Sequence, residues 1–136
     1  MAGILVIGEI ANGAPTRRTL ELATLARGMA EATGASASVL LTGAGAADAA
    51  AETATYGLPV LVADGATAGP TAAGIAAQAA AVIADRTPDW VLVGASPDGK
   101  EVAGALVGLT DLPVLVNGSG VSVADGAPVA EMSTFG

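Results

Sequence analysis

The sequence predicts one α/β domain of three layers, in which helices cover both faces of a mostly parallel sheet and an antiparallel hairpin follows at the C-terminus. Three observations support this prediction. Five short apolar runs recur along the chain, a helical pattern separates each run from the next, and an Asp-Gly turn between alternating valines follows the last run. Unbroken apolar runs are typical of strands covered on both faces. Strands that alternate with helices form right-handed βαβ units, for which we expect the strand order 3-2-1-4-5.

The predicted strands are short and rich in Val, Ile and Leu. They are ILVI at 4–7, SVLLT at 38–42, PVLVA at 59–63, WVLV at 90–93 and PVLV at 113–116. The final stretch differs, because valines alternate with other residues on both sides of the turn Asp125-Gly126, from Val121 to Val129. This pattern predicts a hairpin added to the parallel sheet.

Four amphipathic patterns occupy the segments between these strands. The first begins at Pro15 and Thr16 and stops at Gly34, because proline suits a first turn and glycine suits a helix end. The second covers 46–56, the third begins at Pro70 and Thr71, and the fourth covers 97–109. Apolar residues at helical spacing mark the faces we expect to be buried. They are Leu22, Leu25, Ala26 and Met29 in the first helix, Ile75, Ala79, Val82 and Ile83 in the third, and Val102, Ala105, Leu106 and Leu109 in the fourth.

The composition describes the expected core. The 136 residues match the length of one domain and contain no linker, so we expect a single domain over residues 1–136. Apolar residues make up 52%, but much of that is alanine and only 2% of residues are aromatic. We therefore expect an aliphatic core in which helices pack closely through small side chains.

The charge balance excludes two classes of partner. The net charge is −8 and the pI is about 4.1. Nucleic acid and anionic membrane surfaces both require a basic face, so neither is expected as a partner. No apolar run reaches the roughly 18–20 residues of a membrane helix, and the N-terminal run lacks the basic flank of a signal peptide. We expect a cytoplasmic protein.

The chain contains no cysteine and no histidine. Disulfides, thiolate nucleophiles, Cys/His zinc sites and a Ser-His-Asp triad are therefore excluded. A small enzyme that relies on carboxylates is a third hypothesis, which the sequence disfavours because no paired acids converge on a predicted cleft.

The candidate site lies where the strand order reverses, between the first and fourth strands. Open α/β sheets bind ligands beyond the carboxyl ends of their strands at this point. The loops there contain the six candidates for a nucleotide or anion site, namely Gly8, Glu9, Gly94, Ala95, Ser96 and Lys100. Ser96 is expected to cap the fourth helix, whose free N–H groups could hold an anion.

Two of these candidates have alternative interpretations. Lys100 stands near the helix start, where the helix dipole disfavours a cation. It either meets a phosphate or a partner's carboxylate, or it is solvated or paired with Asp98 or Glu101. Glu9 is either a ribose acceptor or an exposed loop carboxylate. Neither G-x-x-x-x-G-K-[ST] nor G-x-G-x-x-G after the first strand is present.

Four co-linear segments resemble one known family. They are ILVIGE with the following Asn-Gly turn and TLELATLARGMAEATG, then YGLPVLVADG at 56–65, VLVGASPDGKEVAGALVGL at 91–109, and VSVADGAPVAEMSTFG at the end. In this order they are similar to the N-terminal domain of electron-transfer flavoprotein alpha subunits, a member of the adenine-nucleotide-hydrolase-like and universal-stress-protein-like α/β superfamily. Pro97 within the turn GASPDG is a departure that the family pattern does not require.

The resemblance implies a supporting role in FAD-mediated electron transfer. In that family, this domain packs against a beta subunit, and a second domain holds most of the FAD contacts. No segment resembles that second domain, so we expect no cofactor in this chain and FAD only together with the missing domain. The implied partner is a beta-type subunit, or a second copy in a homodimer, and the implied role is electron carrier component rather than enzyme.

One alternative function remains open. A stand-alone module of the universal-stress type would bind an adenine nucleotide such as AMP at Gly94–Ser96 with Lys100. Its second glycine-rich phosphate segment is not evident, and NGSG at 117–120 is the nearest equivalent.

Overall fold

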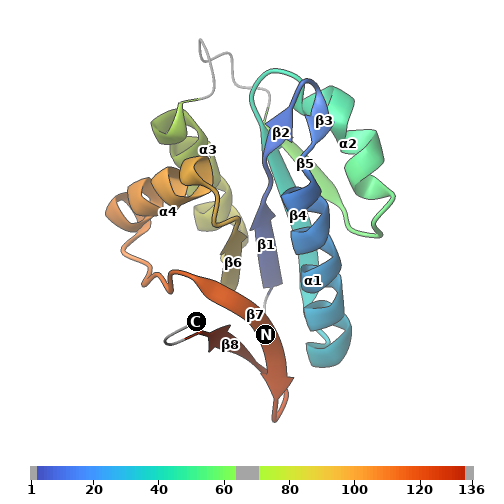
Figure 1. Ribbon diagram of the computed structural model, residues 1–136, viewed down its shortest axis with the longest axis vertical. Coiled ribbons are helices and arrows are strands. Elements are labelled where there is room, and N and C mark those ends of the chain that lie inside the picture. The colour runs from blue at the N-terminus through green and yellow to red at the C-terminus, as the bar shows by residue number, and fades with distance from the viewer. Residues whose placement is uncertain (1–2, 64–70, 134–136) are drawn as a thin grey trace.

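The computed structural model describes residues 3–63 and 71–133, and it has three layers (Figure 1). The central layer is a four-stranded parallel sheet of order β5-β4-β1-β6. Its strands are β1 (Gly3–Ile7), β4 (Ser36–Thr42), β5 (Val60–Ala63) and β6 (Trp90–Val93). The predicted α/β class and the order 3-2-1-4 of the first four predicted strands are confirmed.

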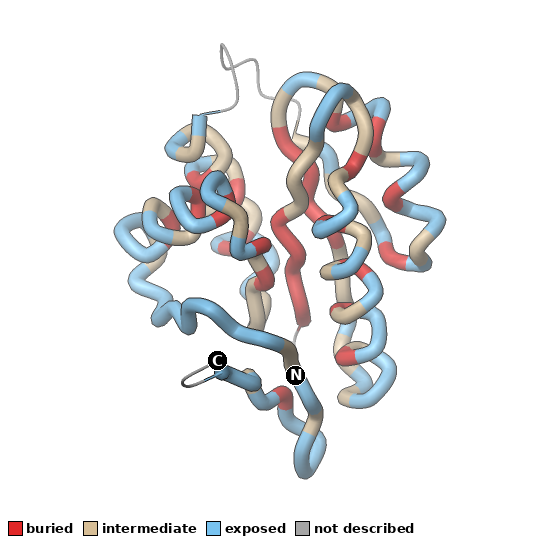
Figure 2. The backbone as a smooth tube through the Cα atoms, viewed as in Figure 1, coloured by how far each residue is buried: buried red, intermediate tan, exposed pale blue. Residues whose placement is uncertain are grey.

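Four helices cover the two faces of this sheet. They are α1 (Arg17–Thr33), α2 (Ala46–Ala54), α3 (Ala72–Arg86) and α4 (Pro97–Thr110). Side chains of α1 and α2 pack with Ile4, Val6 and Val39 on one face, and side chains of α3 and α4 pack with Leu5 and Ile7 on the other. Figure 2 shows the buried residues along β1 between these helices. Consecutive residues of β1 therefore enter opposite cores, which explains why the strand is apolar throughout.

The helices begin at the residues that the sequence indicates. Thr16, Thr71 and Ser96 are the N-caps of α1, α3 and α4, and each accepts a hydrogen bond from the backbone N–H three residues ahead. Gly34 ends α1 in a left-handed conformation, as predicted. The predicted start of α3 at Pro70 lies outside the described residues.

The predicted fifth strand at 113–116 is wrong. These residues form neither helix nor strand, and every residue from 111 to 119 is exposed. The same letters PVLV occur at 59–62, where Val60, Leu61 and Val62 pair with β4. The composition of a segment therefore shows that it can form a buried strand. Whether the strand forms depends on a neighbouring strand that pairs with it and on helices that cover it.

The predicted hairpin forms, but not as part of the main sheet. Strands β7 (Gly118–Ala124) and β8 (Ala127–Met132) pair with each other in a separate sheet beside α1. Asp125 and Gly126 turn between them with φ of 50° and 77°, the left-handed values expected of a two-residue hairpin turn. The expectation that the hairpin extends the parallel sheet is corrected, because no described strand joins β7 or β8 to β6.

A second hairpin was not predicted. Strands β2 (Ile10–Ala11) and β3 (Ala14–Pro15) pair across Asn12 and Gly13, which both have positive φ. Each strand has two residues, too few for a periodic pattern to reveal.

Small side chains set the spacing between helices and sheet, as the composition predicts. Ala23, Ala26, Ala76 and Ala79 are fully buried. The inward pattern of α4 holds at Val102 and Leu106, but Leu109 is 57% exposed. It lies in the last turn, next to the exposed segment that follows α4.

We expect Ala79→Leu to lower the free energy of unfolding by about 1–3 kcal/mol, because extra methylenes in a filled core force neighbours to shift. Ala77→Leu is the matched control, since Ala77 lies on the same helix and is exposed. That change should stay within about 0.5 kcal/mol of the parent chain. Urea unfolding curves measure both variants. Equal stability of the two would contradict the close packing of α3.

Candidate functional site

The loops after β1 and β6 meet at the carboxyl edge of the sheet. β1 and β6 are paired neighbours, with Ile7 opposite Val93, so the residues that follow each strand emerge side by side. This juxtaposition brings Gly8 and Glu9 close to Gly94, Ala95 and Ser96. The structure therefore assembles five of the six predicted candidates at one edge.

The backbone of Glu9 is fixed by two threonines of the α1 start. Its N–H donates to Thr19 Oγ1 at 2.7 Å, and Thr19 Oγ1 donates in turn to the Glu9 carbonyl at 2.8 Å. The N–H of Thr16 donates to the same carbonyl at 3.0 Å. Thr19 is 1% exposed, so these hydrogen bonds are shielded from water. They hold Glu9 in a defined position at the edge of the sheet.

The side chain of Glu9 reaches the start of α4. Ser96 Oγ donates to Glu9 Oε1 at 2.5 Å and accepts from the N–H of Gly99 at 2.9 Å. This relay places a carboxylate at the positive end of α4, where the helix dipole favours an anion. Glu9 is thus not an isolated loop carboxylate in this structure, because it completes the cap of α4. Its role as a ribose acceptor stays a prediction.

Two glycines permit this arrangement. A Cβ built on Gly99 would overlap the carbonyl oxygen of Gly94 and would lie 2.9 Å from Glu9 Oε1. A Cβ on Gly94 would lie 3.1 Å from the same carboxylate oxygen. Both glycines are buried. The first turn of α4 can therefore approach the end of β6 closely only because neither residue has a side chain.

Gly8 has a packing role at the end of β1. Its N–H donates to the Leu40 carbonyl at 2.9 Å, and an added Cβ would lie 2.6 Å from a methyl group of Leu41. Gly8 therefore joins the loop to β4.

Ala95 lies at this edge, and Lys100 lies in α4, four residues after Ser96. Both are exposed, and Lys100 forms no ion pair within the described residues. Of the interpretations offered above, a pairing with Asp98 or Glu101 is not seen. Whether Lys100 meets a ligand or a partner stays a prediction.

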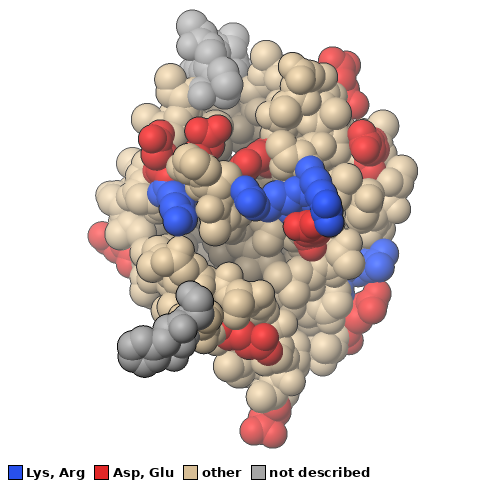
Figure 3. Space-filling view, in the orientation of Figure 1, with Lys and Arg blue, Asp and Glu red and all other residues tan. Residues whose placement is uncertain are grey.

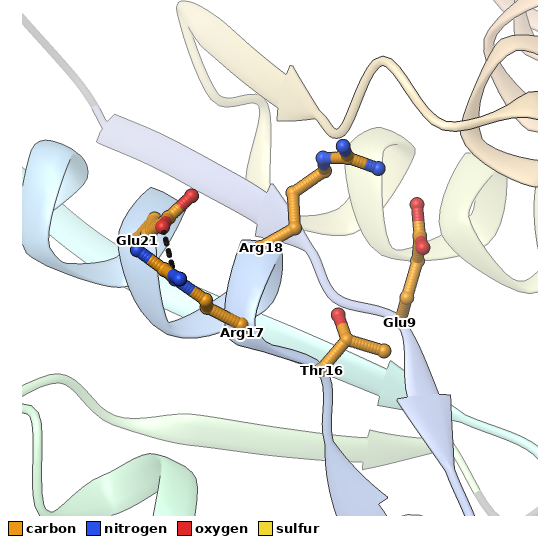
Figure 4. Close-up of a pocket in the computed structure, with 5 residues that line it drawn as sticks. All are labelled: Glu9, Thr16, Arg17, Arg18 and Glu21. Carbon is orange, nitrogen blue, oxygen red and sulfur yellow. Dashed lines mark hydrogen bonds and ion pairs between the residues drawn. The ribbon is translucent and has the colours of Figure 1, made fainter.

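The residue that sequence analysis missed here is Arg18. The aliphatic part of its side chain packs against Gly94, since a Cβ on Gly94 would lie 3.1 Å from Arg18 Cγ. Arg18 forms no ion pair with any described residue, whereas Arg17 pairs with Glu21 at 2.8 Å. Figure 4 shows Arg18 and Glu9 projecting to the same side while Arg17 turns toward Glu21. No pattern in the sequence indicates this contact, because it joins residues far apart in the chain.

An open depression lies beside these groups. Its lining consists of Glu9, Thr16, Arg17, Arg18 and Glu21. In Figure 3 the hollowed middle of this face is bordered by basic side chains. The lining combines two acids with two arginines, so it offers hydrogen-bonding groups of both signs.

Two other kinds of site are absent from residues 3–63 and 71–133. No group of three or more acidic residues there could hold a metal ion. None of the helices in that part of the chain combines the length and apolar content needed to cross a bilayer.

Comparison with known families identifies the family of the chain. The model of the electron transfer flavoprotein domain matches residues 4–136. The chain belongs to the electron transfer flavoprotein domain family. The resemblance drawn from the four sequence segments is thereby confirmed for the family. Members of this family are components of electron carriers. No curated protein matches the chain at a significant level.

In this electron transfer flavoprotein domain, Gly99→Ala should cost more than about 3 kcal/mol of stability, because the new methyl group meets rigid backbone and α4 must shift. Gly104→Ala is the control on the same helix. An added Cβ there meets nothing within 4 Å, so that variant should gain about 0.5–1 kcal/mol from helix propensity. Thermal and urea unfolding separate the two outcomes. A stable Gly99→Ala chain would refute the close approach of α4 to β6.

Glu9→Ala should lower the unfolding free energy by about 1–2 kcal/mol, since it removes the charged acceptor of the Ser96 hydroxyl. Glu21→Ala removes an exposed partner of Arg17 and should cost less than about 0.5 kcal/mol. Urea unfolding at neutral pH compares the two. If both glutamates contributed equally, the cap formed by Glu9 would have no special role.

Proposed function

We propose that this chain is the alpha-type scaffold domain of an electron-transfer flavoprotein. In this proposal it docks to a beta-type subunit and holds no flavin itself. Electrons then pass through an FAD that a second domain, outside these residues, holds in place. The chain works in the cytoplasm in this proposal.

The observation that carries the proposal is the family match over residues 4–136, which places the chain among electron-carrier components. The alpha type is supported by the resemblance of the segment VLVGASPDGKEVAGALVGL to alpha subunits. This segment forms most of β6, the turn and most of α4. Ser96 and Gly99 of this segment build the cap that receives Glu9.

The hydrogen bonds at the carboxyl edge of the sheet favour a scaffold role for the domain rather than nucleotide binding. A ligand phosphate at the start of α4 would compete with the Glu9 carboxylate for the Ser96 hydroxyl and for the same end of the helix dipole. The segment NGSG at 117–120, the nearest equivalent of a second phosphate segment, forms the start of β7 at the other end of the sheet from the carboxyl ends of β1 and β6 (Figure 1). An AMP site of the universal-stress type therefore gains no support from the arrangement of these segments.

The test combines a visible spectrum with two titrations. The purified chain should have no stoichiometric absorption band at about 450 nm, where oxidised flavin absorbs. Calorimetry should detect binding of the beta-type subunit from the same source and no heat from millimolar AMP. A stoichiometric flavin band or saturable AMP binding would overturn the scaffold role. Absence of binding to the beta-type subunit would overturn the docking role.

A further inference from the structure

Arg18 differs from the other arginines of this domain in having no bonding partner among the described residues. It is exposed, and it forms neither a hydrogen bond nor an ion pair with any residue of 3–63 or 71–133. The other three arginines all bond within the chain. Arg17 pairs with Glu21 at 2.8 Å, Arg27 donates to the Tyr56 carbonyl at 3.1 Å, and Arg86 pairs with Asp85 at 3.6 Å. The guanidinium of Arg18 is therefore available to another molecule.

The aliphatic part of Arg18 is nevertheless held in place. Its Cγ and Cδ atoms occupy the space that a side chain on Gly94 would fill, because an added Cβ there would lie 3.1 Å and 2.5 Å from them. Arginine can pack its aliphatic stem in this way while its charged end stays in water. A molecule that binds the guanidinium therefore orders less of the side chain than it would for a freely rotating arginine.

The position of Arg18 in α1 is unfavourable for the stability of the isolated domain. Arg18 is the second residue of α1, where the helix dipole disfavours a cation, and the first turn contains no acidic residue to offset it. Thr16 already caps this helix by accepting a hydrogen bond from the N–H of Thr19. Arg18 thus contributes neither a cap nor an ion pair to the described fold.

The surroundings of Arg18 restrict the kind of ligand that it can bind. It lines the open depression together with Glu9, Thr16, Arg17 and Glu21. The two carboxylates of this lining already bond to Ser96 and to Arg17, so the positive charge of Arg18 is left uncompensated. Sites for small molecules are concave and mostly apolar, unlike this one. The ligand group is therefore an anion carried by a larger molecule that makes further contacts outside the depression.

Glu9 favours a carboxylate over a phosphate as that anion. Glu9 and Arg18 meet over Gly94, since an added Cβ there would lie 3.1 Å from Glu9 Oε1, and Figure 4 shows both side chains projecting to the same side. A phosphate monoester carries nearly twice the charge of a carboxylate at neutral pH, so Glu9 repels it more strongly. A carboxylate also matches the planar guanidinium, which can bind it through two parallel hydrogen bonds.

We propose that Arg18 anchors an Asp or Glu side chain of a different protein, which docks at the carboxyl edge of the sheet. Arginine is among the residues that most often dominate the binding energy of an interface. A second copy of this chain is disfavoured as the partner, because two chains of net charge −8 repel each other. The inference goes beyond the proposed function and does not depend on it, so either can fail alone.

The first experiment uses the peptide acetyl-Ala-Glu-Ala-amide as a model of the partner's carboxylate. Two-dimensional NMR follows the Nε–H signal of each arginine during the titration. The Arg18 signal should shift and saturate with a Kd on the order of 10 mM, as expected of one charged bidentate contact. The Arg86 signal should shift much less, because Asp85 already pairs with that residue. The neutral peptide acetyl-Ala-Gln-Ala-amide should shift neither signal.

The second experiment changes Arg18 and keeps its packing. Arg18→Gln retains Cγ and Cδ, the atoms that contact Gly94, and removes the charge. The affinity for the acidic peptide, followed through the backbone N–H signals of Gly94 and Ser96, should fall at least about tenfold. The melting temperature should stay equal or rise, because a cation leaves the helix start.

Arg86→Gln is the matched control for this substitution. Arg86 lies in the last turn of α3, where a cation is favoured, and it pairs with Asp85. This variant should keep the affinity for the peptide within about twofold and should not raise the melting temperature. An unchanged affinity in Arg18→Gln would overturn the proposal.

Three further outcomes would also overturn it. Equal shifts of all four arginine signals would show general attraction between charges rather than an anchor at Arg18. Saturation of the Arg18 signal by inorganic phosphate at a lower concentration than by the acidic peptide would assign the site to a phosphate. A dimer found by ultracentrifugation of the chain alone, and dissociated by Arg18→Gln, would make a second copy the partner.

Discussion

The close approach of α4 to the end of β6 is the constraint on which the sheet edge depends. Gly99 lies against the carbonyl of Gly94, and only glycine fits at this distance. The approach brings Ser96 within 2.5 Å of Glu9, a residue 87 positions earlier in the chain. Loops that follow two neighbouring strands are thereby joined by one charged hydrogen bond. A longer distance between helix and strand would leave both the carboxylate and the helix start to water.

The cap formed by Glu9 alters what this edge offers to other molecules. A helix start with free N–H groups attracts anions, but here the carboxylate already lies at that position. An incoming phosphate must overcome a fixed negative charge and replace a hydrogen bond that the protein makes for itself. Arg18 and Lys100 remain without ion pairs among the described residues, so positive charge is still present beside the edge. The electrostatic character of the edge is therefore mixed.

Local patterns in the sequence predicted most of the elements, and long-range contacts account for the misses. The caps at Thr16, Thr71 and Ser96 follow from side chains that bond a backbone group three residues away. The contact between Ser96 and Glu9 joins distant segments and has no periodic pattern, so the sequence predicted two site residues without predicting their bond. The four apolar runs that form strands each pair with a neighbour, and the run at 113–116 does not.

That last run differs from the other four in its pairing and burial rather than in its composition. PVLV at 59–62 pairs with β4, whereas no described strand pairs with 113–116, and every residue from 111 to 119 is exposed. A strand is stabilised by backbone hydrogen bonds to its neighbours and by burial of its side chains, and residues 113–116 obtain neither from the described part of the chain. The apolar letters of a segment therefore predict a strand only where a neighbouring strand supplies the hydrogen bonds.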